Sequence, residues 1–234
     1  MNIEWLGQSG YILRTSNAVL AIDPYLSDAV ERVAGRPRLF PSPIAPEQLC
    51  ADALVCTHDH LDHLDPDAVV RMKAGMRFIT TEGGAAHLHA LGIDHVDVLH
   101  EGESTAVGDM QVTAVFAKHT VEAFGLLVRG DGLTLYFSGD TLFDERLYAV
   151  AQKKPDATLV CINGKLGNMN VDEAVQVARY IGAPLNIPNH YGMFASNTED
   201  PAKFTGRIPG AVEMTVGVPY RIVRDPDGVR LERG

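Results

Sequence analysis

The densest group of reactive side chains lies at residues 57–63, which read Thr-His-Asp-His-Leu-Asp-His. Three of the chain's nine histidines, His58, His60 and His63, fall within six positions there, together with two aspartates. Neutral imidazole and carboxylate suit borderline divalent cations, and the absence of thiolates favours an open catalytic site over a closed structural one. The alternative, a polar surface loop, would not concentrate histidines directly after an apolar run. The segment therefore predicts a metal site.

Three later residues have the same ligand chemistry. His119 follows the run 110–118, Asp140 follows 133–139, and His190 follows 183–189, so each comes at the end of an expected strand. Alone, such a residue is more often a hydrogen-bonded turn residue, because turns favour polar side chains. Their joint occurrence with the histidine cluster favours a shared cleft instead.

The elements that position these residues alternate between strands and helices. Short β-branched runs separated by turn residues predict strands in the first quarter, and β-rich groups follow at 103–138 and 212–232. Further strands are expected at 77–80, 96–99 and 157–162, and helices at 66–74, 83–91, 143–152 and 171–181. Two sheets that each carry helices on one face must pack through their other faces. We expect a single α/β domain over 1–234, a four-layer αββα sandwich.

The ordered ligand candidates resemble the HxHxDH…H…D…H motif of the metallo-β-lactamase superfamily, with Ser-Gly-Asp-Thr at 138–141 around the aspartate. The resemblance implies that one divalent ion binds His58, His60 and His119, that a second binds Asp62, His63 and His190, and that Asp140 bridges them. It implies one or two ions, Mn²⁺ or Zn²⁺, with Asp62 and Asp140 as the catalytic carboxylates that orient the attacking water.

Two residues near the N-terminus match the family pattern in position. Asp23 resembles the acid that hydrogen-bonds the histidine loop and fixes the orientation of the ligands, although a turn-capping role explains it equally well. Gln8 stands where relatives often have a histidine near the mouth of the metal site. We expect Gln8 to contribute to substrate binding there.

Four flanking segments are similar to the branch that contains L-ascorbate-6-phosphate lactonase: Ile-Asp-Pro-Tyr-Leu-Ser-Asp, Arg-Leu-Phe-Pro-Ser-Pro-Ile, Asn-Gly-Lys-Leu-Gly-Asn-Met-Asn and Pro-Asn-His-Tyr-Gly-Met-Phe. The histidine motif departs from that branch, since it has Leu61 where asparagine is expected. The likeness implies lactonase-like hydrolysis of a small lactone or related ester, including a phosphorylated one. Three alternatives stay open: hydrolysis of a small or cyclic phosphodiester, a catalytically silent regulatory module, and redox chemistry at a di-iron centre.

The segment 163–170 predicts an anion site. It offers Lys165, Asn168 and Asn170 between an expected strand and a helix N-terminus, where backbone N–H groups and the helix dipole favour negative charge. We expect Tyr191 to help form this pocket. Because these groups favour negative charge, the predicted substrate is a small anion. For Asn170 alone, the helix N-cap is the better interpretation.

The composition narrows the class of partner and the compartment. A net charge of −10 disfavours nucleic acid and anionic membranes, and 46% hydrophobic residues are typical of a folded domain. No secretory leader or membrane span is recognisable, so we expect a cytoplasmic protein; a homo-oligomer is neither favoured nor excluded. The three cysteines are expected to be reduced core thiols, with Cys56 as a catalytic thiolate the alternative.

Residues 27–49 are rich in proline and lack periodicity. An ordered surface loop and a lid over the cleft explain that segment equally well. The remaining histidines that lie between the motif segments have no partner at ligand spacing, and we expect them to be surface or core residues: His87, His89, His95 and His100.

Overall fold

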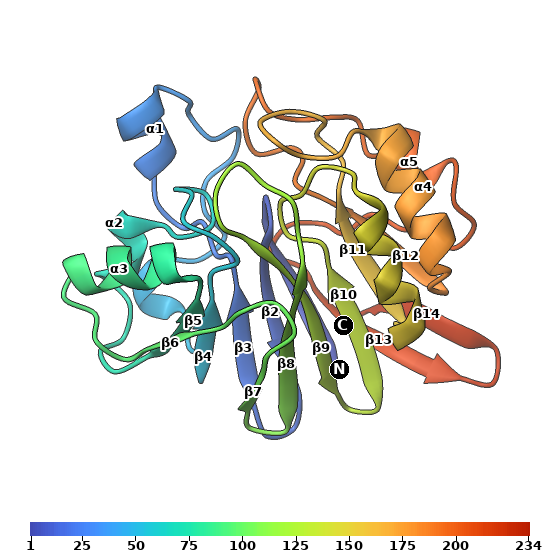
Figure 1. Cartoon of the computed structure of the whole chain (residues 1–234), viewed down its shortest axis with the longest axis horizontal. Helices are drawn as coiled ribbons and strands as arrows, with labels where there is room; N and C mark the ends of the chain where they lie inside the picture. The colour runs from blue at the N-terminus through green and yellow to red at the C-terminus, as the bar shows by residue number, and fades with distance from the viewer.

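The computed structural model describes residues 1–234 and contains two β-sheets (Figure 1). The eight-stranded sheet has the order β14-β13-β1-β2-β3-β4-β5-β6, and the six-stranded sheet has the order β12-β11-β10-β9-β8-β7. The strands of the first sheet are β1 Asn2–Gly7, β2 Gly10–Arg14, β3 Val19–Ile22, β4 Ala53–Val55, β5 Arg77–Thr80, β6 Val96–Val98, β13 Pro219–Asp225 and β14 Gly228–Arg233. Those of the second are β7 Ser104–Val107, β8 Met110–Phe116, β9 Phe124–Gly130, β10 Leu133–Phe137, β11 Ala157–Cys161 and β12 Leu185–Asn189.

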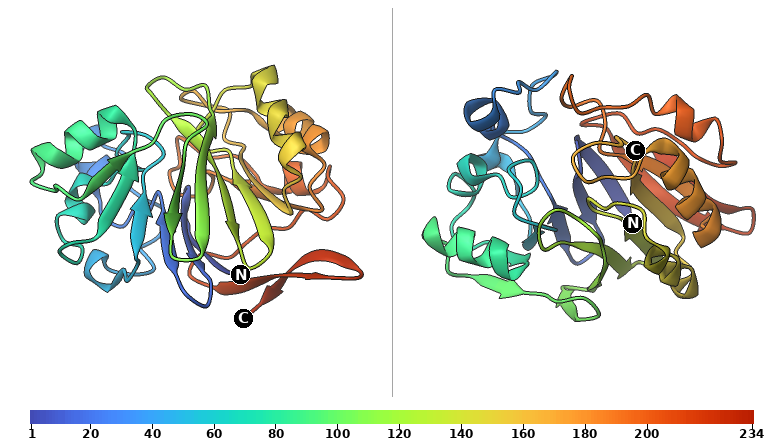
Figure 2. Two further views of the ribbon diagram at one scale, coloured as in Figure 1. Left: turned by 60° about the horizontal axis from the view of Figure 1, so that its bottom comes forward. Right: turned by 45° about the horizontal axis from the view of Figure 1, so that its top comes forward.

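The helices lie on the outer sides of the two sheets, as the two further views also show (Figure 2). The helices on the side of the first sheet are α1 Ala29–Ala34, α2 Pro66–Val69 and α3 Glu82–Ala90, with the 3₁₀ turn η1 Pro46–Gln48. Those on the side of the second sheet are α4 Val171–Ile181, α5 Ala202–Thr205 and the 3₁₀ helix η2 Glu145–Lys153. The predicted αββα sandwich is confirmed. None of the helices is long and apolar enough to cross a membrane.

Two apolar cores hold these layers together. The larger one contains 46 buried residues, among them Leu13 and Leu20 from the first sheet and Leu126 and Leu135 from the second. A separate cluster of 14 buried residues lies between the first sheet and the α2–α3 side, with Leu54 and Leu88 among its members. Because most of this apolar surface is removed from water between the sheets, the strands form a rigid base for the loops at their ends.

The largest differences between the element boundaries and the sequence prediction lie in four segments. The helix expected at 66–74 ends at Val69, and the last strands begin at Pro219 rather than 212. The segment 143–152 forms a 3₁₀ helix. Its buried residues Leu147 and Val150 are three positions apart, a spacing that a 3₁₀ helix places on one face. The segment 27–49, expected to be irregular, contains the short helix α1.

The strand directions bring the candidate ligands to one edge. In the first sheet, β1, β3 and β4 run the same way, because β2 pairs antiparallel with both β1 and β3, and β3 pairs parallel with β4. In the second sheet, β8, β10 and β12 likewise share one direction. The carboxyl ends of these six strands are followed directly by the loops that carry the candidate site: Gln8, Asp23, His58, His119, Asp140 and His190.

Candidate metal centre

Three histidine nitrogens converge on one point. His58 Nε2 lies 2.9 Å from His60 Nδ1, which lies 3.1 Å from His119 Nε2. Ligands at about 2.0–2.1 Å from a tetrahedral zinc are separated by roughly 3.3 Å, so this spacing is close to that of a metal-bound set. The loops after β4 and β8 therefore bring together the first predicted ligand triad.

The other nitrogen of two of these rings is already engaged. His119 Nδ1 donates to the Gly167 carbonyl over 3.0 Å. His58 Nδ1 lies 3.2 Å from Thr57 Oγ1, whose own hydrogen goes to Asp23 Oδ2, so the His58 ring donates there. The Nε2 atoms of His58 and His119 thus carry lone pairs, and both are directed at His60 Nδ1. Nitrogen lone pairs at such distances repel one another unless a proton or a cation lies between them.

The second group contains Asp62, His63 and His190, and Asp140 lies between the two groups. His190 Nε2 is 3.1 Å from Asp140 Oδ2 and 3.5 Å from Asp62 Oδ2. His63 Nε2 is 3.2 Å from Asp140 Oδ1, and His119 Nε2 is 3.9 Å from Asp140 Oδ2. All seven predicted ligands are therefore brought together in three overlapping sets.

Two buried polar atoms of this group that make no hydrogen bond also indicate a cation site. His63 Nε2 and Asp140 Oδ1 are both buried and face each other at 3.2 Å as an ion pair, but neither atom has a hydrogen bond of good geometry. Buried polar atoms without a partner are rare in native proteins and costly. Two such atoms facing each other, beside three converging imidazole nitrogens, are what a metal site provides for its ion.

Burial and mutual proximity set the ionisation of these groups. Burial lowers the pKa of His58 well below its usual value and also lowers the pKa of His60 and His119, so all three stay neutral and able to ligate. Burial disfavours ionised Asp140, but the His190 and His63 rings outweigh it and hold the pKa of Asp140 well below its usual range. Asp140 is therefore a carboxylate at neutral pH.

The histidines that face these carboxylates have raised pKa values. Burial lowers the pKa of His190, but the Asp140 and Asp62 carboxylates outweigh it and raise that pKa to about 9. The pKa of His63 is likewise raised well above its usual value, since Asp140 and Asp23 outweigh the effect of burial. Two rings thus carry protons that an arriving cation would displace.

Asp23 connects the histidine loop to the end of β3. Its carboxylate accepts from Thr57 N and Thr57 Oγ1, both at 2.7 Å, and from His63 Nδ1 at 2.8 Å. These contacts agree with the predicted orienting role and give a physical reason for the buried position of Asp23. Its backbone has φ +43°, a left-handed conformation that aspartate tolerates better than most residues.

Gln8 lies at the second group. Its Nε2 donates to Asp62 Oδ2 over 2.8 Å and is 3.1 Å from His190 Nε2, while its backbone carbonyl accepts from His190 N over 3.2 Å. Gln8 Oε1 is buried without a partner. Gln8 is therefore close to two candidate ligands, and its predicted contact with substrate stays a prediction.

The other four predicted substrate residues differ in burial and in their contacts. Lys165 is exposed, and its Nζ donates to the Ser196 carbonyl over 3.3 Å. Asn168 is buried and donates to Asp140. Asn170 is the N-cap of α4, in a capping box with Glu173, as the alternative interpretation held. Tyr191 is buried in the core with its ring centroid 4.9 Å from that of Trp5, and its contact with substrate stays a prediction.

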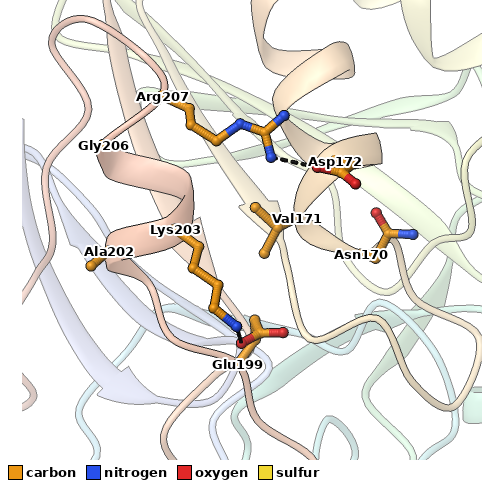
Figure 3. Close-up of a pocket in the computed structure, with 8 residues that line it drawn as sticks. All are labelled: Asn170, Val171, Asp172, Glu199, Ala202, Lys203, Gly206 and Arg207. Atoms are coloured by element: carbon orange, nitrogen blue, oxygen red, sulfur yellow. Dashed lines mark hydrogen bonds and ion pairs between the residues drawn. The ribbon is translucent and has the colours of Figure 1, made fainter.

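Asn170 also lines a surface pocket of about 570 Å³ between the start of α4 and α5 (Figure 3). None of the candidate metal ligands lines this pocket. Its two cationic side chains are already paired, Lys203 with Glu199 at 2.8 Å and Arg207 with Asp172 at 2.5 Å. The pocket is therefore separate from the metal centre, and its two acidic side chains neutralise the charge of its two cationic ones.

The four remaining histidines and segment 27–49 lie outside the candidate ligand groups. None of His87, His89, His95 and His100 belongs to a ligand group, and His87 pairs with Asp59 at 2.6 Å. In segment 27–49, Arg38 donates to the carbonyls of Ser27 and Tyr25, and Leu39 N donates to the Met193 carbonyl. That segment is thus attached to the loop after His190.

The cysteines follow the prediction in two of three cases. Cys56 and Cys161 are buried, whereas Cys50 is exposed, so the expectation that all three are core thiols is wrong for Cys50. Cys50 lies at the end of the η1 turn, where the chain returns to the surface. Burial raises the pKa of Cys56 well above its usual value, which counts against a catalytic thiolate.

Sequence reasoning missed the residues that hold the ligands in place. Thr57 donates to Asp23 and contacts His58, and Asn163 accepts from Asn168 beside Asp140. The carbonyl of Gly167 holds His119. The only sequence signal for them was their position next to the motif residues, since hydroxyl and amide side chains are common in any loop.

Comparison with known proteins agrees with this geometry. The family model described as "Beta-lactamase superfamily domain" matches residues 20–191, which include all seven candidate ligands. The chain belongs to the metallo-β-lactamase superfamily. A "UPF0173 metal-dependent hydrolase" from Methanosarcina mazei is 27% identical over 92% of this chain and 94% of its own length. An uncharacterized protein from Mycobacterium bovis is 31% identical over 97% of this chain and 69% of its own.

Solved structures of other hydrolases have a similar fold. A metallo hydrolase from Ignicoccus hospitalis has a TM-score of 0.74 at 21% identity, covering 95% of this chain and 99% of its own. An isothiocyanate hydrolase from Delia radicum gut bacteria has a TM-score of 0.78 at 20% identity, covering 94% and 98%. At these identities the likeness concerns the fold alone, and the resemblance to the ascorbate-phosphate lactonase branch is not among these matches.

Proposed function

We propose that this superfamily member is a metal-dependent hydrolase that cleaves a small lactone or related ester, in particular one carrying a phosphate or carboxylate. The proposal rests on the position of His60 Nδ1, which lies about one ligand spacing from both His58 Nε2 and His119 Nε2. With Asp140 and the second group beside it, this donor set suits one or two Mn²⁺ or Zn²⁺ ions.

The chemistry follows from what each component can do. A bound divalent ion lowers the pKa of water toward about 7 and polarises an ester carbonyl. Asp62 and Asp140 supply carboxylate oxygens that accept hydrogen bonds from the attacking water and orient it. The low pKa of Asp140 keeps this acceptor ionised at neutral pH. Gln8, which donates to Asp62, restricts the direction of that carboxylate.

Lys165 supports the anionic class of substrate. It lies two residues before Gly167, the residue that holds His119, and its side chain is exposed with only a carbonyl as its partner. An exposed lysine without a paired carboxylate can attract a substrate anion, even though the whole chain carries a net charge of −10. The same net charge disfavours a polymeric nucleic acid as the substrate.

A hydrolysis panel on the metal-reconstituted protein tests this function. The panel contains neutral and phosphorylated lactones, a generic phosphodiester, a β-lactam and, because of the solved relative's name, an isothiocyanate. We expect the lactones to be cleaved, with the phosphorylated ones preferred. Preference for the phosphodiester or the isothiocyanate would replace the proposed substrate, and a fully metal-loaded protein inactive on every member would favour a silent regulatory module.

A further inference from the structure

The segment between β11 and α4 contacts two of the candidate ligands from consecutive residues. The Gly167 carbonyl accepts from His119 Nδ1 over 3.0 Å, and Asn168 Nδ2 donates to Asp140 Oδ2 over 2.9 Å. His119 and Asp140 lie in the loops after two different strands, β8 and β10. One short segment thus sets the orientation of a ligand of the first triad and of the carboxylate between the two groups.

Asn168 has no hydrogen left for another partner. Its Nδ2 donates to Asp140 Oδ2 and also to Asn163 Oδ1 over 3.0 Å, which uses both amide hydrogens. Its Oδ1 is buried without a partner, and only 4% of the residue is exposed. The side chain is therefore a fixed donor to Asp140, and it has no N–H to offer a substrate.

Asn163 fixes the direction of this donor in turn. Its Nδ2 donates to Asn197 Oδ1 over 2.8 Å and to the Lys165 carbonyl over 3.2 Å, so only its Oδ1 can face Asn168. All three asparagines are buried. Because each amide determines which way the next one faces, the chain Asn197–Asn163–Asn168 presents N–H rather than oxygen to Asp140. Amides do not titrate in the ordinary range, so the arrangement is the same at every working pH.

The backbone of the segment is closed tightly enough to hold this geometry. Gly164 N donates to the Met169 carbonyl over 2.9 Å, and Met169 N donates to the Thr141 carbonyl, next to Asp140, over 2.7 Å. Gly167 has φ +91°, and a Cβ built there would lie 2.9 Å from His119 Nδ1. A side chain at 167 would therefore push against the ligand, which explains why glycine is needed at this position.

We propose that Asn168 is a positioning residue for the metal centre, acting through Asp140, and that Asn163 and Asn197 keep it in its donating orientation. Carboxylates that ligate metals are commonly held by such outer hydrogen bonds, and loss of one typically weakens metal binding about 10–100-fold. Asn168 occupies one hydrogen-bonding position on Asp140 Oδ2. The other oxygen, Asp140 Oδ1, makes no hydrogen bond, faces His63 and is available to the ion.

The test measures metal affinity rather than turnover. Asn168→Ala and Asn163→Ala are titrated with Zn²⁺ and Mn²⁺ against a chelating dye, and the visible spectrum of the Co²⁺-loaded protein reports ligand geometry. Asn186→Ala is the matched control. Asn186 is a buried asparagine in β12 that accepts from Thr158 and donates to the Ala183 carbonyl, with no contact to a ligand candidate.

We expect Asn168→Ala to weaken metal binding about 10–100-fold and to change the Co²⁺ spectrum, with Asn163→Ala giving the same change in smaller measure. Asn186→Ala should lower the melting temperature of the metal-free protein and leave affinity and spectrum unchanged. An Asn168→Ala protein with wild-type affinity and spectrum would overturn the proposal. So would an equal loss of affinity in Asn186→Ala, because general loosening would then be the cause. If Asn168→Ala does not fold, Asn163→Ala decides by the same two readouts.

Discussion

His63 donates from Nδ1 to the Asp23 carboxylate over 2.8 Å, and this bond determines that Nε2 is the atom directed at the metal centre. Asp23 also accepts from the backbone and the hydroxyl of Thr57, the residue before His58. A single buried carboxylate thus orients the start of the histidine loop and one ring of the second group. Orientation of this kind reduces the cost of assembling a ligand set around an ion.

Asp23→Asn should therefore weaken metal binding about 10–100-fold, because one amide oxygen cannot accept all three hydrogen bonds. Asparagine tolerates the left-handed backbone at this position, so the change isolates the carboxylate. Affinity is measured by competition with a chelating dye. Asp52→Asn is the control, since Asp52 accepts only an exposed backbone bond from Val19 N. Equal affinities in the two variants would show that Asp23 is only a turn residue.

His119→Ala and Asp140→Ala should each reduce turnover about 10²-fold or more, since each removes a group that holds the ion or orients the attacking water. Folding should be much less affected, because the sheets are held together by the 46-residue core. Rates and thermal melts are measured on the same samples, with the exposed His95→Ala as the control. Parallel losses of activity and melting temperature would mean that the two residues serve the structure.

Lys165→Ala should raise KM for a phosphorylated lactone and leave the hydrolysis of a neutral lactone almost unchanged. This pattern is typical of the loss of binding that is equal in the ground and transition states. Steady-state kinetics on both substrates provide the test, with Lys73→Ala, an exposed lysine in the turn between α2 and β5, as the charge-matched control. If both substrates respond equally, or neither responds, Lys165 does not recognise the anion.

The thiols should differ sharply in reactivity. Burial raises the pKa of Cys161 to about 11, so at pH 8 only about one thiol in a thousand is ionised, and Cys56 is affected in the same direction. A disulfide reagent at pH 8 should titrate one thiol in the native protein, the exposed Cys50, and three in denaturant. Cys56 and Cys161 are also buried, so the reagent reaches them only when the chain opens. Rapid native modification of Cys56, with loss of activity, would revive the thiolate alternative.

The fold and the convergence of the candidate ligands could be predicted because their signals are local or ordered along the chain. The spacing of His58, His60 and His63 and the strand-terminal positions of His119, Asp140 and His190 are visible in the sequence, and shared strand direction brings them to one edge. Helix 171–181 was predicted to the residue, since Asn170 and Gly182 mark its two ends.

The supporting contacts could not be predicted, because they join segments far apart in sequence. Nothing local distinguishes an asparagine that donates to Asp140 from one that contacts substrate, and so Asn168 was assigned to the anion site. Tyr191 follows His190 directly, yet the chain turns there with φ +60° at His190, and the tyrosine packs on Trp5. Only the three-dimensional arrangement shows which neighbours of a ligand face the ion.

Metal analysis of the purified chain after reconstitution is the decisive test of the metal centre. Protein freed of metal with a chelator, incubated with Zn²⁺ or Mn²⁺ and desalted, is measured by elemental mass spectrometry, beside a His58→Ala, His119→Ala double variant that lacks two of the three converging nitrogens. We expect between one and two ions per chain for the wild type and a clear loss in the double variant. Less than about half an ion per wild-type chain, or equal loading of both proteins, would contradict this expectation.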